Sequence, residues 1–336
     1  MLIKTNKIKT ILKNKFLKLN VNIKDIKIVI NSLIKSDLQG HNSHGIMRAL
    51  DYLNKIKEKK INLKPKIKIK TKNNSAKING DWGFGQIIMI SAVSTLKKLI
   101  KKNSIACVVV KNCNHIGRLA LYTDELAKKK ILAICFSNLH GTSHIVSPVN
   151  GMDRKLPSNP IGISAPSKDK IFSCDFATSS LAEGKIKLKY IDNQSVEPGH
   201  LIDFFGKKTI NPKKFYNNPK GSILPFGGLN SHKGFALSLA IDILGGILSG
   251  AGSSNNINNK RHGNSVTLIG INIAKFVNYK FFINEVKKLE EHIKSSRKIK
   301  NKKIYFPGDI EHENLKKNKK KGIQISKNLL KLIKNF

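Results

Sequence analysis

A histidine and an arginine four residues apart, His44 and Arg48, are the residues whose types and spacing point most directly to chemistry. If the segment is helical, the two side chains share one face. An imidazole can move a proton near neutral pH, and a guanidinium can bind a carboxylate through two parallel hydrogen bonds. The pair predicts a site for a small organic acid, and its alternative is a polar pair on an exposed helix.

A second histidine follows a buried strand. His115 comes shortly after the apolar run 105–110, and Arg118 follows it. The carboxyl end of a strand is where α/β folds place their chemistry. Either His44 or His115 is therefore a candidate acid/base, although a histidine that is only hydrogen-bonded in a turn gives the same pattern.

Arginine is scarce in this chain, because only five of the 62 Lys and Arg residues are arginines. Lys, Asn and Ile share A/T-rich codons, so a biased genome explains the net charge of +41 without a polyanionic partner. The basic residues are spread over the chain and no nucleic-acid-binding motif is present, so we expect no specific nucleic-acid partner. An arginine that persists in such a chain marks a position that needs the planar guanidinium group and its fixed hydrogen-bond donors.

Hydrophobic periodicity predicts helices at both ends of the chain around an α/β middle. We expect no membrane-spanning segment, because no apolar run approaches the roughly 20 residues of a membrane span. Four cysteines without a CxxC pattern indicate a reducing, cytoplasmic location. The predicted helices are 4–19, 23–35 with Asn22 as the cap, 44–57, 83–100, 117–128, 178–187, 232–248 and 281–294, with a short element at 323–333. The predicted strands are 64–78, 105–110, 131–137, 161–165, 171–175 and 265–273, and 193–219 is expected to be a polar loop.

The common nucleotide-binding and metal-binding patterns are absent. Gly83 and Gly85 lack the third glycine of a Rossmann fingerprint, and Lys233 is followed by glycine instead of Ser or Thr, which excludes a Walker loop. His140 and His144 have no carboxylate or cysteine at ligand spacing, so no metal is expected. The run that starts at Asp175 and the glycine-rich loop before Lys233 match either ligand-binding loops or an ordinary helix cap and a surface loop.

Six blocks of the chain, in order, resemble the malate/L-lactate dehydrogenase family of the non-Rossmann kind, which includes ureidoglycolate, sulfolactate and diketogulonate oxidoreductases. The blocks are 36–48, 114–117, 158–161, 175–179, 224–234 and 307–309. Segments 115–119 and 140–148 are most similar to the hydroxycarboxylate dehydrogenase branch. Ser158 stands where the family pattern has Thr, and Asp309 where it has Glu.

The resemblance implies an α/β enzyme with a non-Rossmann, mixed-sheet cofactor domain and a helical domain built from both chain ends. It implies a homodimer that uses NAD or NADP to interconvert a small 2-hydroxy acid and its 2-oxo acid. The helical substrate and dimerisation domain would comprise 1–70 plus 278–336, and the NAD(P)-binding domain 71–277. By the same resemblance, the acid/base residues are His44 and His115; the substrate residues are Ser43, Arg48 and Tyr52; and the cofactor residues are Ser137, Asp175, Phe176, Ala177, His232, Lys233, Pro307, Gly308 and Asp309.

Two other functions remain open at this point. The first is reduction of a cyclic imino acid on the same fold, in which C=N replaces C=O. The second is a nonenzymatic basic protein that binds nucleic acid, for which the net charge of +41 is the argument.

Overall fold

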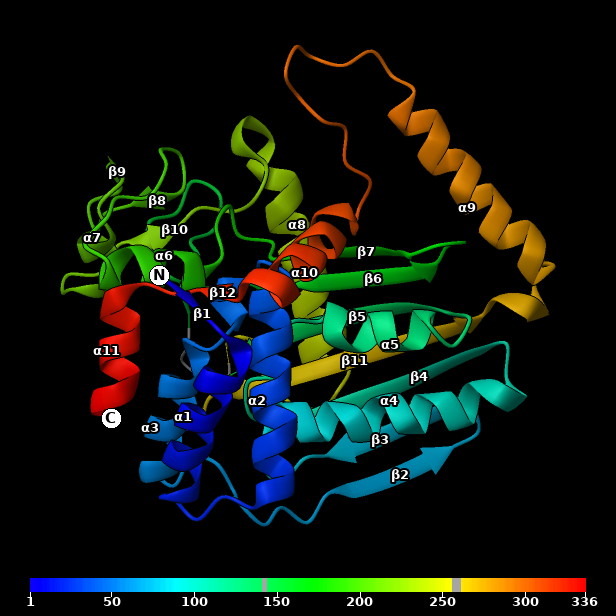
Figure 1. Cartoon of the computed structure of the whole chain (residues 1–336), viewed down its shortest axis with the longest axis horizontal. Helices are drawn as coiled ribbons and strands as arrows, with labels where there is room; N and C mark the ends of the chain where they lie inside the picture. Colours follow the sequence, from blue (N-terminus) through cyan, green and yellow to red (C-terminus); the bar gives the residue numbers. More distant parts are fainter. Residues whose placement is uncertain (141–143, 256–260) are drawn as a thin grey trace.

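The computed structural model describes residues 1–140, 144–255 and 261–336. Its main feature is a seven-stranded sheet in the order β2-β3-β4-β11-β5-β6-β7 (Figure 1). Only β3 and β4 pair in parallel, and the other neighbours are antiparallel. The predicted α/β class with a mixed, non-Rossmann sheet is confirmed. The strands are β2 (Lys68–Lys72), β3 (Ser75–Asn79), β4 (Ile105–Cys113), β5 (Ile131–His140), β6 (Ile161–Pro166), β7 (Ile171–Phe176) and β11 (Gly263–Asn272).

The centre of the sheet is buried under helices. Helices α4 (Gly85–Lys102) and α5 (Ala120–Ala127) cover the near face in Figure 1. Apolar residues of β4 and β11, such as Val108 and Leu268, pack with Ile88, Met89 and Leu96 of α4 in one core. Helix α8 (Ser231–Ile241) continues into a π-helical turn (Asp242–Ile247), which packs against β5 and β11.

A second core joins the two ends of the chain. It contains α1 (Thr5–Leu17), α2 (Ile23–Leu38), α3 (Arg48–Lys57) and α11 (Lys327–Asn335), with β1 (Leu2–Ile3) paired antiparallel to β12 (Ile323–Gln324). As predicted, Asn22 caps α2, since its side chain accepts the N–H of Lys24. The Met1 amino group donates to the carbonyl of Ile325 at 2.8 Å. Both termini therefore belong to the same helical layer.

A third, smaller core corrects the prediction of a polar loop at 193–219. This region contains β8 (Leu201–Ile202), β9 (Lys208–Thr209) and α7 (Pro212–Tyr216), and the sheet order is β10-β8-β9, with β10 at Ser222–Ile223. Helix α6 (Glu183–Ile191) packs on this unit. Two-residue strands carry no periodicity, so only isolated apolar anchors such as Phe215 marked the region.

Other predicted elements have different bounds, and one helix was not predicted. The extended segment 64–78 is a hairpin of β2 and β3, and the helix predicted at 178–187 begins at Glu183. The helix predicted at 44–57 begins at Arg48, and the residues before it form a 3₁₀ turn (Asn42–His44). Helix α10 (Asp309–Lys321) was not predicted, because its lysine-rich sequence has no apolar stripe. Short 3₁₀ turns also occupy Gly228–Asn230 and Ile273–Lys275.

Helix α9 (Tyr279–Lys294) projects from the body of the chain (Figure 1). None of its residues is buried, and Phe281, Leu289 and Ile293 are exposed. Its last turns are attached to the body by Lys294, which pairs with Asp309 of α10 at 2.7 Å. An amphipathic helix whose apolar side chains face solvent in a single chain lacks a packing partner.

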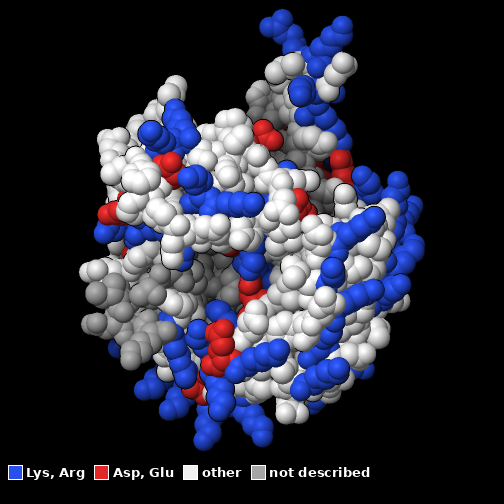
Figure 2. Space-filling view, turned by 90° about the vertical axis from the view of Figure 1, so that its left-hand side faces the viewer, with Lys and Arg blue, Asp and Glu red and all other residues white. Residues whose placement is uncertain are grey.

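Lysine and arginine side chains lie at many separate places on the face of the molecule shown in Figure 2. They form no single stripe on that face. Across the part of the chain that the structure describes, no helix is long and apolar enough to span a membrane.

Candidate active site

A cavity of about 890 Å³ lies between the central sheet, the turn before α3 and the unit that contains α6 and α7. Five Lys and Arg side chains but only two carboxylates line it, so it attracts anions. Of the predicted site residues, eight line the cavity: Ser43, His44, Arg48, His115, Ser137, Asp175, Phe176 and Ala177.

The two candidate histidines are stacked against each other. The rings of His44 and His115 have centroids 5.7 Å apart and planes inclined by 19°. The spacing predicted that His44 and Arg48 share one helical face. They do not, because the helix begins only at Arg48. The 3₁₀ turn instead places the imidazole of His44 against the ring of His115, which follows β4. The structure thus joins the two histidines that the sequence left as separate candidates.

A buried carboxyl group holds the turn that carries His44. Asp37 Oδ2 of α2 accepts the N–H of Ile46 at 2.7 Å. A Cβ at Gly45 would lie 1.9 Å from Asp37 Oδ1, so only glycine permits this approach. Burial raises the pKa of Asp37 to about 8, although the hydrogen bond from Ile46 opposes that shift. At neutral pH the turn therefore rests on a mostly protonated carboxyl group.

His115 ends a chain of three side chains. Gln86 Nε2 donates to Tyr52 Oη at 2.7 Å, and Tyr52 Oη lies 2.8 Å from His115 Nδ1. Among the described residues Tyr52 Oη has no other partner, so its proton is directed at Nδ1. Neutral His115 consequently carries its own proton on Nε2 and acts there as a donor. Tyr52, which was predicted to touch substrate, lies behind His115 and does not line the cavity.

His44 has a different partner at Nδ1. Ser43 Oγ lies 3.0 Å from His44 Nδ1, and a serine hydroxyl can rotate to donate or to accept. When Nδ1 of His44 carries the proton, Nε2 holds a free lone pair. The described part of the chain gives neither histidine a partner for Nε2.

Both imidazoles are neutral at pH 7. Burial, together with the nearby charges of His115 and Arg48, holds the pKa of His44 well below its usual value of 6.5. Burial, followed by the charge of Arg48, has the same effect on the pKa of His115. A neutral imidazole is the form that accepts a proton from an alcohol.

Arg48 is held by the protein on three sides. It donates to the Ser43 carbonyl at 2.8 Å, to Asp51 at 3.0 Å and to Glu183 at 2.8 Å. Although burial opposes ionisation, the Arg48 guanidinium lowers the pKa of Glu183. Gly184 permits this contact, since a Cβ there would lie 2.6 Å from Arg48 Nη2. The Arg48 guanidinium was predicted to bind a substrate carboxylate, but the carboxylates of Asp51 and Glu183 already occupy part of it.

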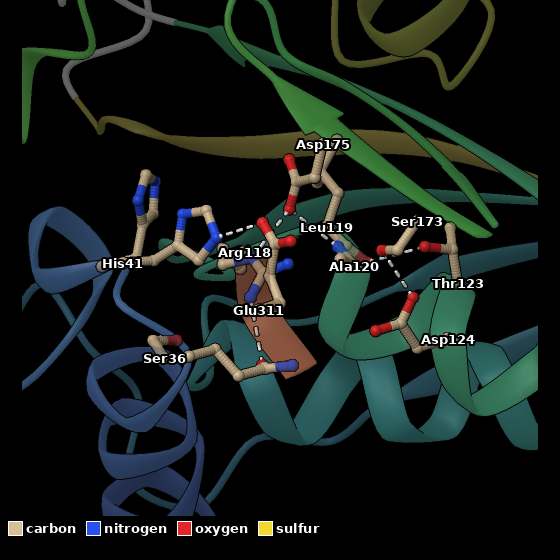
Figure 3. Close-up of polar contacts among 12 residues, drawn as sticks. Ser36, His41, Arg118, Leu119, Ala120, Thr123, Asp124, Ser173, Asp175 and Glu311 are labelled. Carbon is tan, nitrogen blue, oxygen red and sulfur yellow. Dashed lines mark hydrogen bonds and ion pairs between the residues drawn. The ribbon is translucent and has the colours of Figure 1, made fainter. Parts of the chain in front are cut away.

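Asp175, a predicted cofactor residue, also has a structural role. Figure 3 shows its carboxylate beside Arg118 and the N–H of Ala120, at 3.3 and 2.9 Å. This contact connects the end of β7 to the first turn of α5. His41, near the same group, lies 2.8 Å from Glu311 of α10 (Figure 3). One side of the cavity is thus built on the buried ion pair between Arg118 and Asp175.

Five predicted cofactor residues lie outside the cavity lining: His232, Lys233, Pro307, Gly308 and Asp309. Asp309 is engaged by Lys170 and Lys294. Burial raises its pKa, but the hydrogen bonds from these lysines outweigh burial and lower the pKa to about 2. Their cofactor role remains a prediction.

No group of three or more His, Cys, Asp or Glu side chains within the described ranges could hold a metal ion. His144 lines the cavity, and its Nε2 contacts the carbonyl of Ser254. The side chain of His140 lies outside the described residues.

Sequence reasoning missed four side chains of this site: Gln86, Asp51, Glu183 and Arg154. The Arg48–Glu183 contact joins residues 135 positions apart, so no local pattern reveals it. The scarcity of arginine was a usable signal, because Arg48, Arg118 and Arg154 all line the cavity. Applied to all five arginines, it would have indicated Arg154.

The size and charge of the cavity suit part of a nicotinamide cofactor beside a small acid. Its volume of about 890 Å³ lies near the upper end of ligand pockets, which span roughly 300–1,000 Å³. Its excess of cations suits a pyrophosphate, and the half-exposed rings of Phe176 and Phe226, 6.0 Å apart, offer apolar surface to a flat ring.

Comparison with known proteins agrees with this chemistry. A model of the malate/L-lactate dehydrogenase family matches residues 3–334. Malate dehydrogenase of Pyrococcus abyssi is 35% identical over 322 residues, which cover 93% of this chain and 88% of the relative. Hydroxycarboxylate dehydrogenase B of Escherichia coli (strain K12) is 30% identical over 307 residues, 90% and 84% of the two chains. The solved malate dehydrogenase of Pyrococcus horikoshii OT3 has a TM-score of 0.87 at 30% identity, covering 99% of this chain and 93% of that one.

The predictions of an enzyme and of its family are confirmed, and the nonenzymatic alternative is not supported. The protein is a 2-hydroxy acid dehydrogenase, an oxidoreductase that depends on a nicotinamide cofactor. This chain belongs to the malate/L-lactate dehydrogenase family.

Proposed function

We propose that His44 is the acid/base of a reaction that interconverts a small 2-hydroxy acid and its 2-oxo acid, and that His115 donates a hydrogen bond to the same substrate oxygen. The observation that carries the proposal is the stacked histidine pair, whose rings have different partners at Nδ1. When bound, the nicotinamide accepts or supplies the hydride at the substrate carbon.

In the oxidation direction, Nε2 of His44 takes the hydroxyl proton while the C–H bond breaks. Ser43 Oγ then accepts from Nδ1–H of the imidazolium. Nε2–H of His115 stabilises the negative charge that develops on the oxygen. In the reduction direction, the His44 imidazolium returns the proton to that oxygen.

Arg48 is the proposed anchor of the substrate carboxylate. Three of its N–H groups bind Ser43, Asp51 and Glu183, which leaves one N–H on each terminal nitrogen for a ligand. The protein carboxylates fix the plane of the guanidinium, so it meets the ligand in one orientation.

The cofactor, NAD or NADP, is proposed to lie along β5 and β7. Ser137 of β5, Asp175 and Phe176 of β7, and Ala177, which follows β7, support this placement because they line the cavity. We propose that His232, Lys233 and 307–309 meet the parts of the cofactor that extend beyond the cavity.

A second copy of this chain is the proposed partner of α9. Phe281, Leu289 and Ile293 are 57, 53 and 44% exposed, which supports a homodimer. Replacement of Leu289 and Ile293 by glutamate should convert the dimer into a monomer in light scattering; a wild-type monomer would contradict the proposal.

We also propose that the chain divides into a helical domain, 1–70 plus 278–336, and a cofactor domain, 71–277. A cytoplasmic location is proposed because the four cysteines are unpaired thiols.

Kinetics of two histidine variants test the assignment of roles. His44→Asn should lower kcat/KM for 2-oxo acid reduction by about 1,000-fold, within the usual range for removal of a general acid. His115→Asn should lose less, about 30-fold, because an amide N–H can still donate. His312→Asn, at an exposed position of α10, is the control. A larger loss in His115→Asn than in His44→Asn would reverse the assignment.

A substrate panel tests the reaction itself. Wild-type enzyme should reduce 2-oxo acids with NADH or NADPH faster than it reduces a cyclic imino acid. The opposite preference would favour the imine reductase.

A further inference from the structure

Gln86 stands at the far end of the hydrogen-bond chain that leads to His115, and the mechanism above gives it no role. It lies in the first turn of α4 and is 2% exposed. Its Nε2 donates to Tyr52 Oη at 2.7 Å, and Tyr52 Oη lies 2.8 Å from His115 Nδ1. A Cβ at Gly85 would lie 2.5 Å from the carbonyl oxygen of His115, so the start of α4 packs directly on the segment that carries this ring.

The direction of the chain depends on which atom Gln86 turns toward Tyr52. With the amide N–H toward Oη, Tyr52 places its own proton at Nδ1 of His115, whose proton is then on Nε2. With the amide oxygen toward Oη, Tyr52 would donate to Gln86, and His115 would donate from Nδ1 and keep a lone pair at Nε2. The structure has the first arrangement, in which the buried Gln86 Oε1 has no partner among the described residues. Turning the amide would bring its N–H groups to that position, and buried N–H groups without an acceptor are rarer than such carbonyl oxygens.

Tyr52 orients a proton but does not release it. Burial raises the pKa of Tyr52 well above its ordinary value of 10, although the hydrogen bond from Gln86 opposes that shift. Neutral His115 could give up its Nε2 proton only if Tyr52 supplied another to Nδ1, and this step would leave a buried tyrosinate. His115 is therefore restricted to donating a hydrogen bond.

We infer that Gln86 is a positioning residue that assigns the two stacked histidines their different roles. In the proposed mechanism, Nε2 of His44 and Nε2 of His115 meet the same substrate oxygen, and the stacking of the rings favours this arrangement. A hydroxyl group has one proton to give and lone pairs to receive another, so it needs one acceptor and one donor. Gln86 holds His115 as the donor, which leaves His44 as the acceptor. The inference rests on the proposed function, because it assumes that both rings meet that oxygen.

The variant that tests this role is Gln86→Glu. It keeps the shape of the side chain, but an ionised carboxylate can only accept hydrogen bonds. Tyr52 would then donate to the carboxylate and accept from Nδ1–H of His115, so the whole chain would reverse. Measurements are made at about pH 9, because burial raises the pKa of a carboxyl group. Gln194→Glu, which adds the same charge at an exposed position, is the matched control.

Nitrogen NMR of the unliganded enzyme, isotope-labelled at its histidines, locates the proton on His115 directly. The signals that vanish in His115→Asn identify this ring. Wild-type enzyme and Gln194→Glu should carry the proton on Nε2, whereas Gln86→Glu should carry it on Nδ1. A role of Gln86 in packing alone would leave the proton where it is.

Kinetics separate the assignment of roles from general damage to the site. Gln86→Glu should lower kcat/KM for reduction of oxaloacetate or pyruvate about 100-fold, within the usual range for loss of a donor to a developing oxyanion. In a His44→Asn background, the same change should raise kcat/KM for oxidation of malate or lactate about tenfold, because Nε2 of His115 can now accept the hydroxyl proton. General damage would lower kcat/KM in both backgrounds.

Three results would overturn the inference: a wild-type His115 that carries its proton on Nδ1, a Gln86→Glu variant that keeps the proton on Nε2, or oxidation by His44→Asn that Gln86→Glu does not increase. If Gln86→Glu fails to fold, the wild-type spectrum still decides the first of these. Failure of wild-type enzyme to reduce any 2-oxo acid would instead refute the proposed function. The spectrum needs no turnover, so the two failures are distinguishable.

Discussion

Replacement of Asp37 by asparagine should stabilise the protein increasingly as the pH rises. The carboxyl group is 5% exposed, and its pKa is raised to about 8 from an ordinary value of 3.8. An asparagine oxygen can still accept the N–H of Ile46, so the turn that carries His44 keeps its hydrogen bond. The variant therefore removes the ionisation and leaves the geometry.

The sign follows from proton binding. Between pH 3.8 and 8 the folded protein holds a proton on Asp37 that the unfolded chain has lost, so the stability of the wild type falls as the pH rises through this window. The slope is about 1.4 kcal/mol per pH unit. From pH 5 to pH 8, Asp37→Asn should gain roughly 4 kcal/mol relative to the wild type.

Urea unfolding of both proteins at pH 5, 6, 7 and 8, followed by circular dichroism, measures this difference. The comparison between variants cancels the titration of all other groups. A difference that does not change with pH would show that Asp37 titrates normally, and it would refute the reasoning about its burial.

Three further predictions concern the site. Gly184→Ala should lower kcat/KM at least 10-fold and also lower the melting temperature, because its Cβ would lie 2.6 Å from both Arg48 Nη2 and the backbone carbonyl oxygen of Ser43; an unchanged kcat/KM would contradict this. Arg118→Met should reduce the free energy of unfolding by about 3–5 kcal/mol, because it leaves the Asp175 carboxylate buried without its partner; a denaturation midpoint equal to that of the wild type would count against it. Since the pKa of His44 is well below 6.5, kcat/KM for reduction should rise about tenfold per unit fall in pH from pH 8 to 6, whereas oxidation should stay level; a flat reduction profile would exclude His44 as the proton donor.

Periodic stretches of the chain predicted the fold well. The helices of the N-terminal half and the central strands have apolar residues at regular intervals, and tertiary packing uses those faces. The region around Phe215 has no such interval, because its strands are two residues long, and it was predicted as a loop. The lysine-rich helix α10 was not predicted, because its sequence is polar on all sides and lacks an apolar stripe.

The candidate site was predicted as residue types and only partly as geometry. His44 and His115 were named separately, but their stacking depends on a 3₁₀ turn that spacing alone cannot distinguish from a helix. Tyr52 was expected to touch substrate, and its actual contact with His115 follows from the start of α3 at Arg48. Glu183 and Arg154 come from distant segments, so only the folded chain brings them to the cavity.

Isotope transfer tests the central claim most directly. Wild-type enzyme would be mixed with a 2-oxo acid and reduced nicotinamide cofactor that carries deuterium at the hydride position, and the product would be analysed by mass spectrometry. A 2-hydroxy acid one mass unit heavier than the unlabelled product is the predicted result, with about a thousandth as much formed by His44→Asn in the same time. An unlabelled hydroxy acid, or no hydroxy acid at all from any 2-oxo acid supplied with either cofactor, would contradict the account.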